Sequence, residues 1–141
     1  MLRLLQDYEL DIIKDDPVRP HIEAAWRIRS GREVYVLEDD DTGKINAVLC
    51  VAYTDEVPTR ELDMSWPGVD IAVFYTVWSY TKGAGREIIF ATQKQIKRNN
   101  PYIKRYVTLS PLTQMAEKFH LRNGAKFIAK HSDCQNFEYP A

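Results

Sequence analysis

The sequence predicts a single α/β domain, residues 1–141, built on one mixed sheet with helices packed on both of its faces. Two strand patterns separated by a polar turn predict an antiparallel hairpin in the first half. A strand, a glycine turn, a helix and a second strand follow, and such a crossover makes its two strands parallel. At 141 residues and 45% hydrophobic composition, the chain is long enough to bury one core.

The first half is expected to contain one helix, the hairpin and a long loop. Residues 15–32 predict the helix, with a proline in its first turn and Ser30-Gly31 as its end signal. Residues 33–37 and 45–53 predict the two strands, joined by the turn EDDDTGK. Residues 54–69 are polar and interrupted by prolines, which indicates a short helix plus loop or a functional loop.

The second half is expected to alternate strands and helices. Residues 70–80, DIAVFYTVWSY, are dense in β-branched and aromatic side chains and predict a central strand buried on both faces. A glycine turn breaks this run, and residues 86–98 predict a helix with an apolar stripe. The remaining chain predicts a strand at 105–109, a helix at about 113–122 and one or two strands after residue 124.

The net charge of -1 conceals two opposed halves. Residues 1–70 carry 8 basic and 16 acidic side chains, net -8, whereas residues 71–141 carry 11 and 4, net +7. A compact anion is therefore expected to bind the second half. A duplex-sized polyanion would also meet the acidic half, which makes nucleic acid an unfavourable partner.

The sequence gives no sign of a membrane segment or a metal site. Arg3, Asp7 and Glu9 interrupt the start of the chain, so no signal peptide is expected, and no apolar run approaches the ~20 residues of a membrane span. Cys50 and Cys134 stand in no metal-ligand spacing. We expect a cytoplasmic protein with reduced thiols and no bound metal.

The segment TKGAGRE lies where the central strand gives way to a helix, and it predicts an anion site. Helix N-terminal amides favour phosphate, Gly83 and Gly85 let the backbone approach it, and Lys82 and Arg86 bracket the turn. Taken alone, two glycines also suit any tight turn, and basic residues often only form a solvated helix face. A Walker loop is absent, and the third glycine of a dinucleotide fingerprint would fall at Ile88.

The order of elements and the sequence YTKGAG resemble the GNAT superfamily of acyl-CoA-dependent N-acyltransferases. In that family a long strand leads into a pyrophosphate loop of pattern Q/R-x-x-G-x-G/A. The resemblance implies a GNAT-like three-layer α/β/α fold and binding of acetyl-CoA or another acyl-CoA. The residues it assigns to this cofactor are Tyr80, Lys82, Gly83, Ala84, Gly85 and Arg86, with Tyr80 standing where the family has Gln or Arg.

A second resemblance covers roughly residues 70–139. The blocks VFYTVWSYTKG, VTLSP, FHLRNGA and NFEY resemble, in the same order, the catalytic domain of malonyl-CoA decarboxylase, without that family's insertions and its helical domain. The resemblance implies that Ser110 and His120 are a catalytic pair. A strand end and the following helix often border one cleft, and a neutral imidazole can accept or donate a proton. Each residue also has an ordinary alternative, as a strand-ending turn or a half-buried helix residue.

These observations leave three functions open. The first is acyl transfer from acetyl-CoA to an amine on a small molecule or protein, with His120 as the acid for the departing thiolate and Glu61, Asp63 or Asp70 as a base. The second is malonyl-CoA decarboxylation by Ser110 and His120. The third is a non-catalytic GNAT-like interaction or virion-assembly protein of a bacteriophage. Assembly into a homo-oligomer also stays open.

Overall fold

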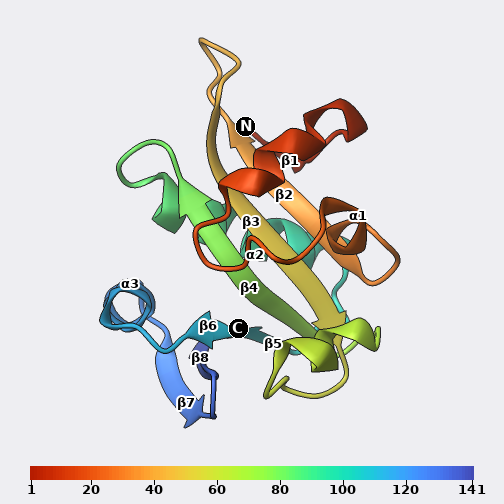
Figure 1. Cartoon of the computed structure of the whole chain (residues 1–141), viewed down its shortest axis with the longest axis vertical. Coiled ribbons are helices and arrows are strands. Elements are labelled where there is room, and N and C mark those ends of the chain that lie inside the picture. Colours follow the sequence, from red (N-terminus) through yellow and green to blue (C-terminus); the bar gives the residue numbers. More distant parts are fainter.

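The computed structural model describes residues 1–141 and contains one eight-stranded mixed sheet (Figure 1). Its strands are β1 (Leu2–Leu4), β2 (Arg32–Glu38), β3 (Ile45–Thr54), β4 (Ile71–Ser79), β5 (Arg105–Thr108), β6 (Ser110–Pro111), β7 (Lys126–Lys130) and β8 (Cys134–Tyr139). They follow the order β1-β2-β3-β4-β5-β8-β6, and β7 pairs with β8. Only β4 and β5 pair in parallel, so the predicted mixed sheet is confirmed.

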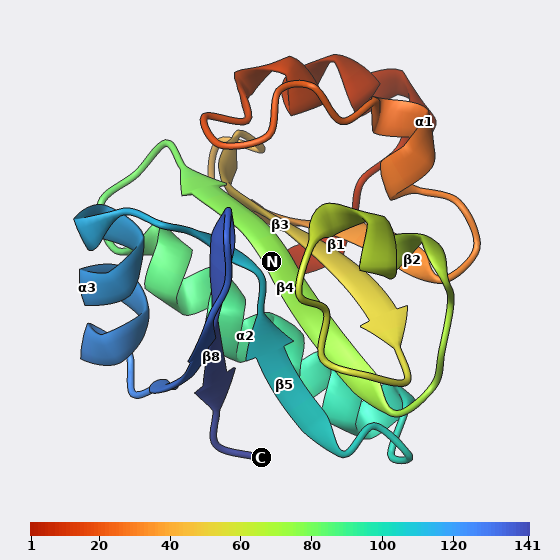
Figure 2. The same ribbon diagram turned by 60° about the horizontal axis from the view of Figure 1, so that its bottom comes forward.

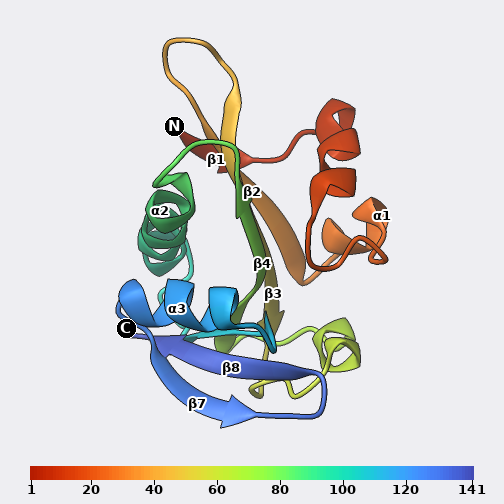
Figure 3. The same ribbon diagram turned by 60° about the vertical axis from the view of Figure 1, so that its left-hand side comes forward.

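Helices cover both faces of the sheet. They are the 3-10 helices η1 (Asp7–Asp15) and η2 (Glu61–Ser65) and the α-helices α1 (Ala24–Arg27), α2 (Ala84–Asn99) and α3 (Gln114–Arg122). In Figure 3, α2 and α3 lie on one side of the sheet, and η1 and α1 lie on the other. The predicted α/β class with three layers is therefore confirmed.

Alternation along the strands divides the core into two clusters, one on each face of the sheet. On β3, Leu49 and Val51 belong to the cluster that contains Ile88 of α2. Their neighbours Val48 and Cys50 belong to the cluster that contains Ile13 of η1. A central strand with both faces buried explains why the residues of β3 and β4 form nearly continuous apolar runs.

The helix predicted over residues 15–32 is mostly wrong, because α1 spans only Ala24–Arg27. The fully buried side chain of Arg27 explains the difference. Its guanidinium pairs with Asp16 at 2.7 Å and donates to the backbone carbonyls of Arg19 (2.6 Å) and Ile22 (3.0 Å). The Ile22 carbonyl accepts from this side chain, and the Arg19 carbonyl accepts from it and from the Ile22 amide at 3.1 Å, so neither makes the backbone bond of a longer helix.

Three further elements escaped prediction, and the rest followed the expected order. The prediction missed η1 and the short strands β1 and β6, which have too few residues to show a periodic pattern. Residues 110–111, expected as a break after the strand, pair with β8 as β6. The hairpin β2–β3, the strand β4, the helices η2, α2 and α3 and two terminal strands all lie where the sequence predicts them, within a few residues.

The strands β4 and β5 part halfway along β4. They pair only from Ile71 to Phe74 on β4, whereas β4 continues to Ser79. Tyr75 is a bulge that has no partner in β3, because Phe74 pairs with Val51 and Thr76 with Cys50. After the end of β5 the chain runs away from β4 toward α3, as Figure 2 shows. This separation opens the sheet where a cavity lies.

Substitution of Arg27 by Met should lower the free energy of unfolding by about 3–5 kcal/mol, because the buried Asp16 carboxylate would lose its cation. Urea unfolding followed by circular dichroism measures the change. The exposed pair between Arg60 and Asp63 provides the control, since Arg60→Ala should cost less than about 1 kcal/mol. Equal losses in the two variants would contradict this role for Arg27.

Candidate functional site

A cavity of about 320 Å³ lies between the free end of β4, the start of α3 and the chain at Pro17 and Val18. Seventeen residues line it, and none of them is Asp, Glu, Lys or Arg. Ser110 and His120, the pair implied by the sequence blocks, both belong to this lining, although no hydrogen bond joins them. The parting of β4 and β5 therefore places two polar side chains in an otherwise largely apolar pocket.

Ser110 is held at the end of β5 by a hydroxyl network. Its Oγ donates to the Thr108 hydroxyl at 2.7 Å, and that hydroxyl also accepts the backbone N–H of Phe137 at 3.0 Å. Ser110 is 2% exposed and begins β6, which pairs with β8. Two strands thus fix the direction of the Ser110 side chain.

His120 lies in the last turns of α3, buried among aromatic rings. Its ring stacks on Phe137 with centroids 5.4 Å apart, and its Nδ1 lies 2.8 Å from the Tyr139 hydroxyl. Burial lowers the pKa of His120 to about 4, so the imidazole is neutral at pH 7. Tyr139 is 1% exposed and the one hydrogen-bond contact of its hydroxyl is with His120 Nδ1, so we take the hydroxyl as the donor and the neutral ring nitrogen as the acceptor. We therefore assign the ring proton to Nε2, which has no partner in the protein.

The first turn of α2 presents free backbone amides. The helix begins after Gly83, whose φ of 84° lies in the left-handed region that favours glycine. Ala84 N–H bonds to the Thr81 carbonyl at 3.1 Å, whereas the amides of Gly83, Gly85 and Arg86 have no acceptor in the chain. Free amides and the helix dipole together favour an anion at this turn.

Gly85 also brings α2 against α3. A Cβ at this position would lie 3.3 Å from the Phe119 ring, tighter than most packed side chains allow. Both Gly85 and Phe119 line the cavity. The first turn of α2 and the cavity therefore meet at Gly85.

Some of the polar side chains predicted around this turn are hydrogen-bonded to other residues, and others are not. Lys82 is exposed, and Arg86 donates to the Asn123 side chain at 2.9 Å. Tyr80 donates its hydroxyl to Asp15 at 2.7 Å, so its side chain is tied to η1. Of the predicted set, the backbone amides of Gly83, Gly85 and Arg86 and the cation of Lys82 are free to meet an anion.

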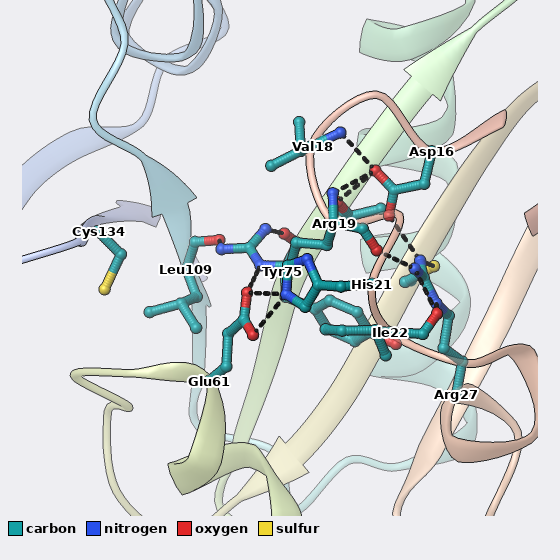
Figure 4. Close-up of polar contacts among 12 residues, drawn as sticks. Asp16, Val18, Arg19, His21, Ile22, Arg27, Glu61, Tyr75, Leu109 and Cys134 are labelled. Carbon is teal, nitrogen blue, oxygen red and sulfur yellow. Dashed lines mark hydrogen bonds and ion pairs between the residues drawn. The ribbon is translucent and has the colours of Figure 1, made fainter. Parts of the chain in front are cut away.

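Sequence reasoning missed a charged cluster centred on Arg19 (Figure 4). This side chain is 4% exposed, and its guanidinium donates to the carbonyls of Tyr75 and of Leu109, the latter at 2.8 Å. Its Nε pairs with Glu61 at 3.0 Å, and Glu61 also contacts His21 at 2.9 Å. Arg19 thus bridges β4 and the chain after β5 where the two strands part. The partners lie too far apart in sequence for any spacing pattern to reveal them.

The three carboxylates predicted as bases do not line the cavity. Glu61 is held by Arg19 and His21, and Asp63 accepts the Thr59 amide at 2.9 Å. Asp70 lies 3.9 Å from Lys104, before the start of β4. The cavity thus offers uncharged polar groups to a reaction, and no carboxylate.

Two further features of the chain bear on the sequence expectations. No three His, Cys, Asp or Glu side chains are grouped to hold a metal ion, and Cys50 and Cys134 are both free and buried. None of the helices combines the length and the apolar composition needed to cross a bilayer.

Comparison with known proteins identifies similar solved structures. No protein-family model matches the sequence, and no curated protein matches it. Malonyl-CoA decarboxylase from Agrobacterium vitis superposes with a TM-score of 0.67 at 22% identity, over 84% of this chain and 35% of the decarboxylase. The chain thus spans about a third of the decarboxylases it matches.

Acetyltransferase structures match over nearly their whole length. A Bacillus subtilis acetyltransferase in complex with CoA gives a TM-score of 0.65 at 11% identity, covering 97% of this chain and 93% of that one. A GNAT family acetyltransferase from Elizabethkingia anophelis with acetyl-CoA bound gives 0.61 at 9% identity, covering 98% and 94%. At these identities the likeness shows the fold alone.

The lowered pKa of His120 should make stability fall at acid pH. Between pH 6.5, near the ordinary pKa, and about pH 4, the His120 imidazole is protonated in the unfolded chain and neutral in the folded one. The free energy of unfolding therefore falls as the pH decreases through this range, by up to about 3 kcal/mol. Urea unfolding at several pH values should show this loss in the native chain and a smaller loss in His120→Gln. Parallel curves for the two proteins, or an NMR titration of His120 near 6.5, would contradict it.

Proposed function

We propose that this chain, which has the GNAT fold, binds an acyl-CoA and transfers its acyl group to an amine. In this proposal the diphosphate of CoA lies on the backbone amides of Gly83, Gly85 and Arg86, with the side chains of Lys82 and Arg86 beside it. The acyl end enters the cavity that Ser110 and His120 line.

One observation carries the proposal. Gly85 contributes a free amide to the first turn of α2 and also lines the cavity. A ligand with a phosphate group at one end and an apolar arm at the other can therefore occupy both places at once. The solved structures support this reading, because two that match over more than nine-tenths of their length hold CoA or acetyl-CoA.

The cavity suits a thioester carbonyl better than a charged group. Because His120 is neutral, its Nε2–H can donate a hydrogen bond to the carbonyl oxygen as negative charge develops there. The amine nitrogen bonds to the carbonyl carbon, the C–S bond breaks, and one amine proton passes to the sulfur. The lowered pKa leaves little imidazolium to act as an acid, so we assign His120 the role of hydrogen-bond donor.

Decarboxylation of malonyl-CoA is the second candidate, and the cavity lining favours it. No carboxylate is present there to deprotonate an incoming amine, whereas decarboxylation needs none. In that reaction the bond to the carboxylate carbon breaks, carbon dioxide leaves, and the electrons form an enolate of the thioester. In this second proposal Nε2–H of His120 donates to the enolate oxygen, Ser110, whose hydroxyl donates to Thr108, lines the same cavity, and the enolate carbon then takes a proton from water.

Binding of CoA should raise the melting temperature of the protein, and the double variant Lys82→Gln with Arg86→Gln should bind about tenfold or more weakly, because it removes two cations beside the diphosphate. Titration calorimetry at two salt concentrations measures this loss. Lys94→Gln removes a charge further along α2 and serves as the control, with affinity kept within about twofold. Absence of CoA binding to the native chain would reject the proposal and favour a non-catalytic interaction role.

The two reactions are separated by their need for an acceptor. Acetyl-CoA with an amine should release free thiol, whereas malonyl-CoA alone should yield acetyl-CoA only if the chain is a decarboxylase. In either case His120→Phe should lower kcat by about 10²–10³ while KM for the acyl-CoA changes little, because the lost donor acts as charge develops. Unchanged turnover in both His120→Phe and Ser110→Ala would exclude this site.

A further inference from the structure

Thr108 contacts Ser110 but does not line the cavity. Its side chain is 0% exposed and lies outside the cavity lining, whereas Ser110 belongs to that lining. The two hydroxyl oxygens are 2.7 Å apart. Thr108 can therefore act on a group of the proposed reaction site without touching a ligand in the cavity.

The hydrogen bonds of Thr108 leave its own hydroxyl hydrogen unused. A threonine hydroxyl offers one donor and two acceptor positions. Oγ1 of Thr108 accepts from the Ser110 hydroxyl at 2.7 Å and from the backbone amide of Phe137 at 3.0 Å, so both acceptor positions are filled. The Thr108 hydrogen itself has no acceptor in the chain. An unpaired donor inside a protein is unfavourable.

The hydrogen bond between the two hydroxyls can run in either direction, because each group is both a donor and an acceptor. If Thr108 donates to Ser110 Oγ, the Thr108 hydrogen is paired and the bond from the Phe137 amide is kept. The Ser110 hydrogen is then the one without a partner in the protein, and it can point into the cavity. With a carbonyl oxygen in the cavity, only this reversed direction pairs both hydrogens.

We propose that Thr108 is a positioning residue, which donates to Ser110 when the carbonyl oxygen of an acyl-CoA enters the cavity and so directs the Ser110 hydroxyl to that oxygen. The inference rests on the proposed function, because it assumes a thioester in the cavity. Ser110 then gives a second hydrogen bond to the oxygen that receives the Nε2–H of His120. Thr108 touches neither the substrate nor the reacting atoms.

The Phe137 amide gives this arrangement its direction. A backbone amide can only donate, so it holds one lone pair of Thr108 Oγ1 in place and leaves the hydroxyl hydrogen to face Ser110. The hydrogen bonds then run one way, from the amide on β8 through Thr108 and Ser110 to the carbonyl oxygen. Successive bonds of one direction strengthen one another, so the Ser110 hydroxyl becomes a better donor as negative charge develops on that oxygen.

A double-mutant cycle on kcat separates this role from a purely structural one. Thr108→Val keeps the shape of the side chain and removes the hydroxyl. It should lower kcat about tenfold with KM for the acyl-CoA little changed, because the Ser110 donor is no longer directed as charge develops. In a Ser110→Ala background the same substitution should cause no further loss. Equal losses in both backgrounds would show that Thr108 acts only by holding the Phe137 amide, and would overturn the proposal.

Two single variants complete the comparison. Thr108→Ser retains the hydroxyl and should keep kcat within about threefold of the native value. Thr92→Val is the matched control, since Thr92 is also 0% exposed and its hydroxyl has no hydrogen-bond partner. Its kcat should stay within about twofold of the native value. A native kcat in folded Thr108→Val, or a Thr108→Ser variant as slow as Thr108→Val, would contradict the role of the hydroxyl.

Neutron diffraction of the native chain tests the same hydrogen bonds directly, and it serves if Thr108→Val does not fold. The ligand is the ketone analogue of acetyl-CoA, in which a methylene group replaces the thioester sulfur and no thiol can be released. In the complex the deuterium between the two hydroxyls should belong to Thr108, and that of Ser110 should point to the ketone oxygen. A Ser110 deuterium directed at Thr108 in the complex would overturn the proposal. Failure of the analogue to bind would reject acyl-CoA binding itself, and this inference with it.

Discussion

The parting of β4 from β5, held open by the guanidinium of Arg19, is the constraint on which the site depends. Parallel strands that separate leave backbone carbonyls without partners, and a buried carbonyl needs a donor. Arg19 supplies donors to both sides, at Tyr75 and at Leu109. The buried pair of Asp16 and Arg27 fixes the chain segment from which Arg19 extends. The sheet can open at the cavity because Arg19 donates hydrogen bonds to the Tyr75 and Leu109 carbonyls where the strands part.

The surroundings of that cavity determine the chemistry it can support. No charged side chain lines the cavity, and nearby ones such as Glu61 and Arg19 form ion pairs with each other. The polar side chains that line it are the neutral His120 and the hydroxyl residues Tyr75, Thr76, Ser79, Ser110 and Thr113. Such groups stabilise charge that develops during a reaction by donating hydrogen bonds, and they do not bring a permanent charge to the substrate. A thioester carbonyl, which becomes negative only as it reacts, matches this environment.

The sequence allowed local structure to be predicted better than long-range contacts. The strands β3 and β4 and the helix α2 were foreseen because each contains a strong apolar pattern and a clear end signal. The turn at Gly83 was foreseen because its conformation requires glycine. The structure of the segment before α1 was not foreseen. Its sequence has a helix-like pattern, but the buried side chain of Arg27 donates hydrogen bonds to backbone carbonyls of this segment.

The roles of single polar residues depended on partners far away in the chain. Ser110 and His120 came from resemblance to a family, and their common cavity could be seen only in three dimensions. Arg19 gave no signal, because an arginine beside a loop is ordinarily solvated, and Asn123 indicated only the end of a helix. The opposed charges of the two halves did point to the first turn of α2, but not to the single contact between Arg86 and Asn123.

The bridge made by Arg19 also sets the order in which the molecule can assemble. Arg19 bonds to carbonyls that lie 56 and 90 positions further along the chain. Contacts of such separation carry a large loop-closure entropy and form late, after the local hairpin and helices. During synthesis Arg19 cannot bond to the Leu109 carbonyl until β5 has left the ribosome, although Ile13 of the same segment packs on residues of β2 and β3. The contact of Arg19 with Leu109, which joins the two sides of the opened sheet, therefore forms only after most of the chain has been synthesised.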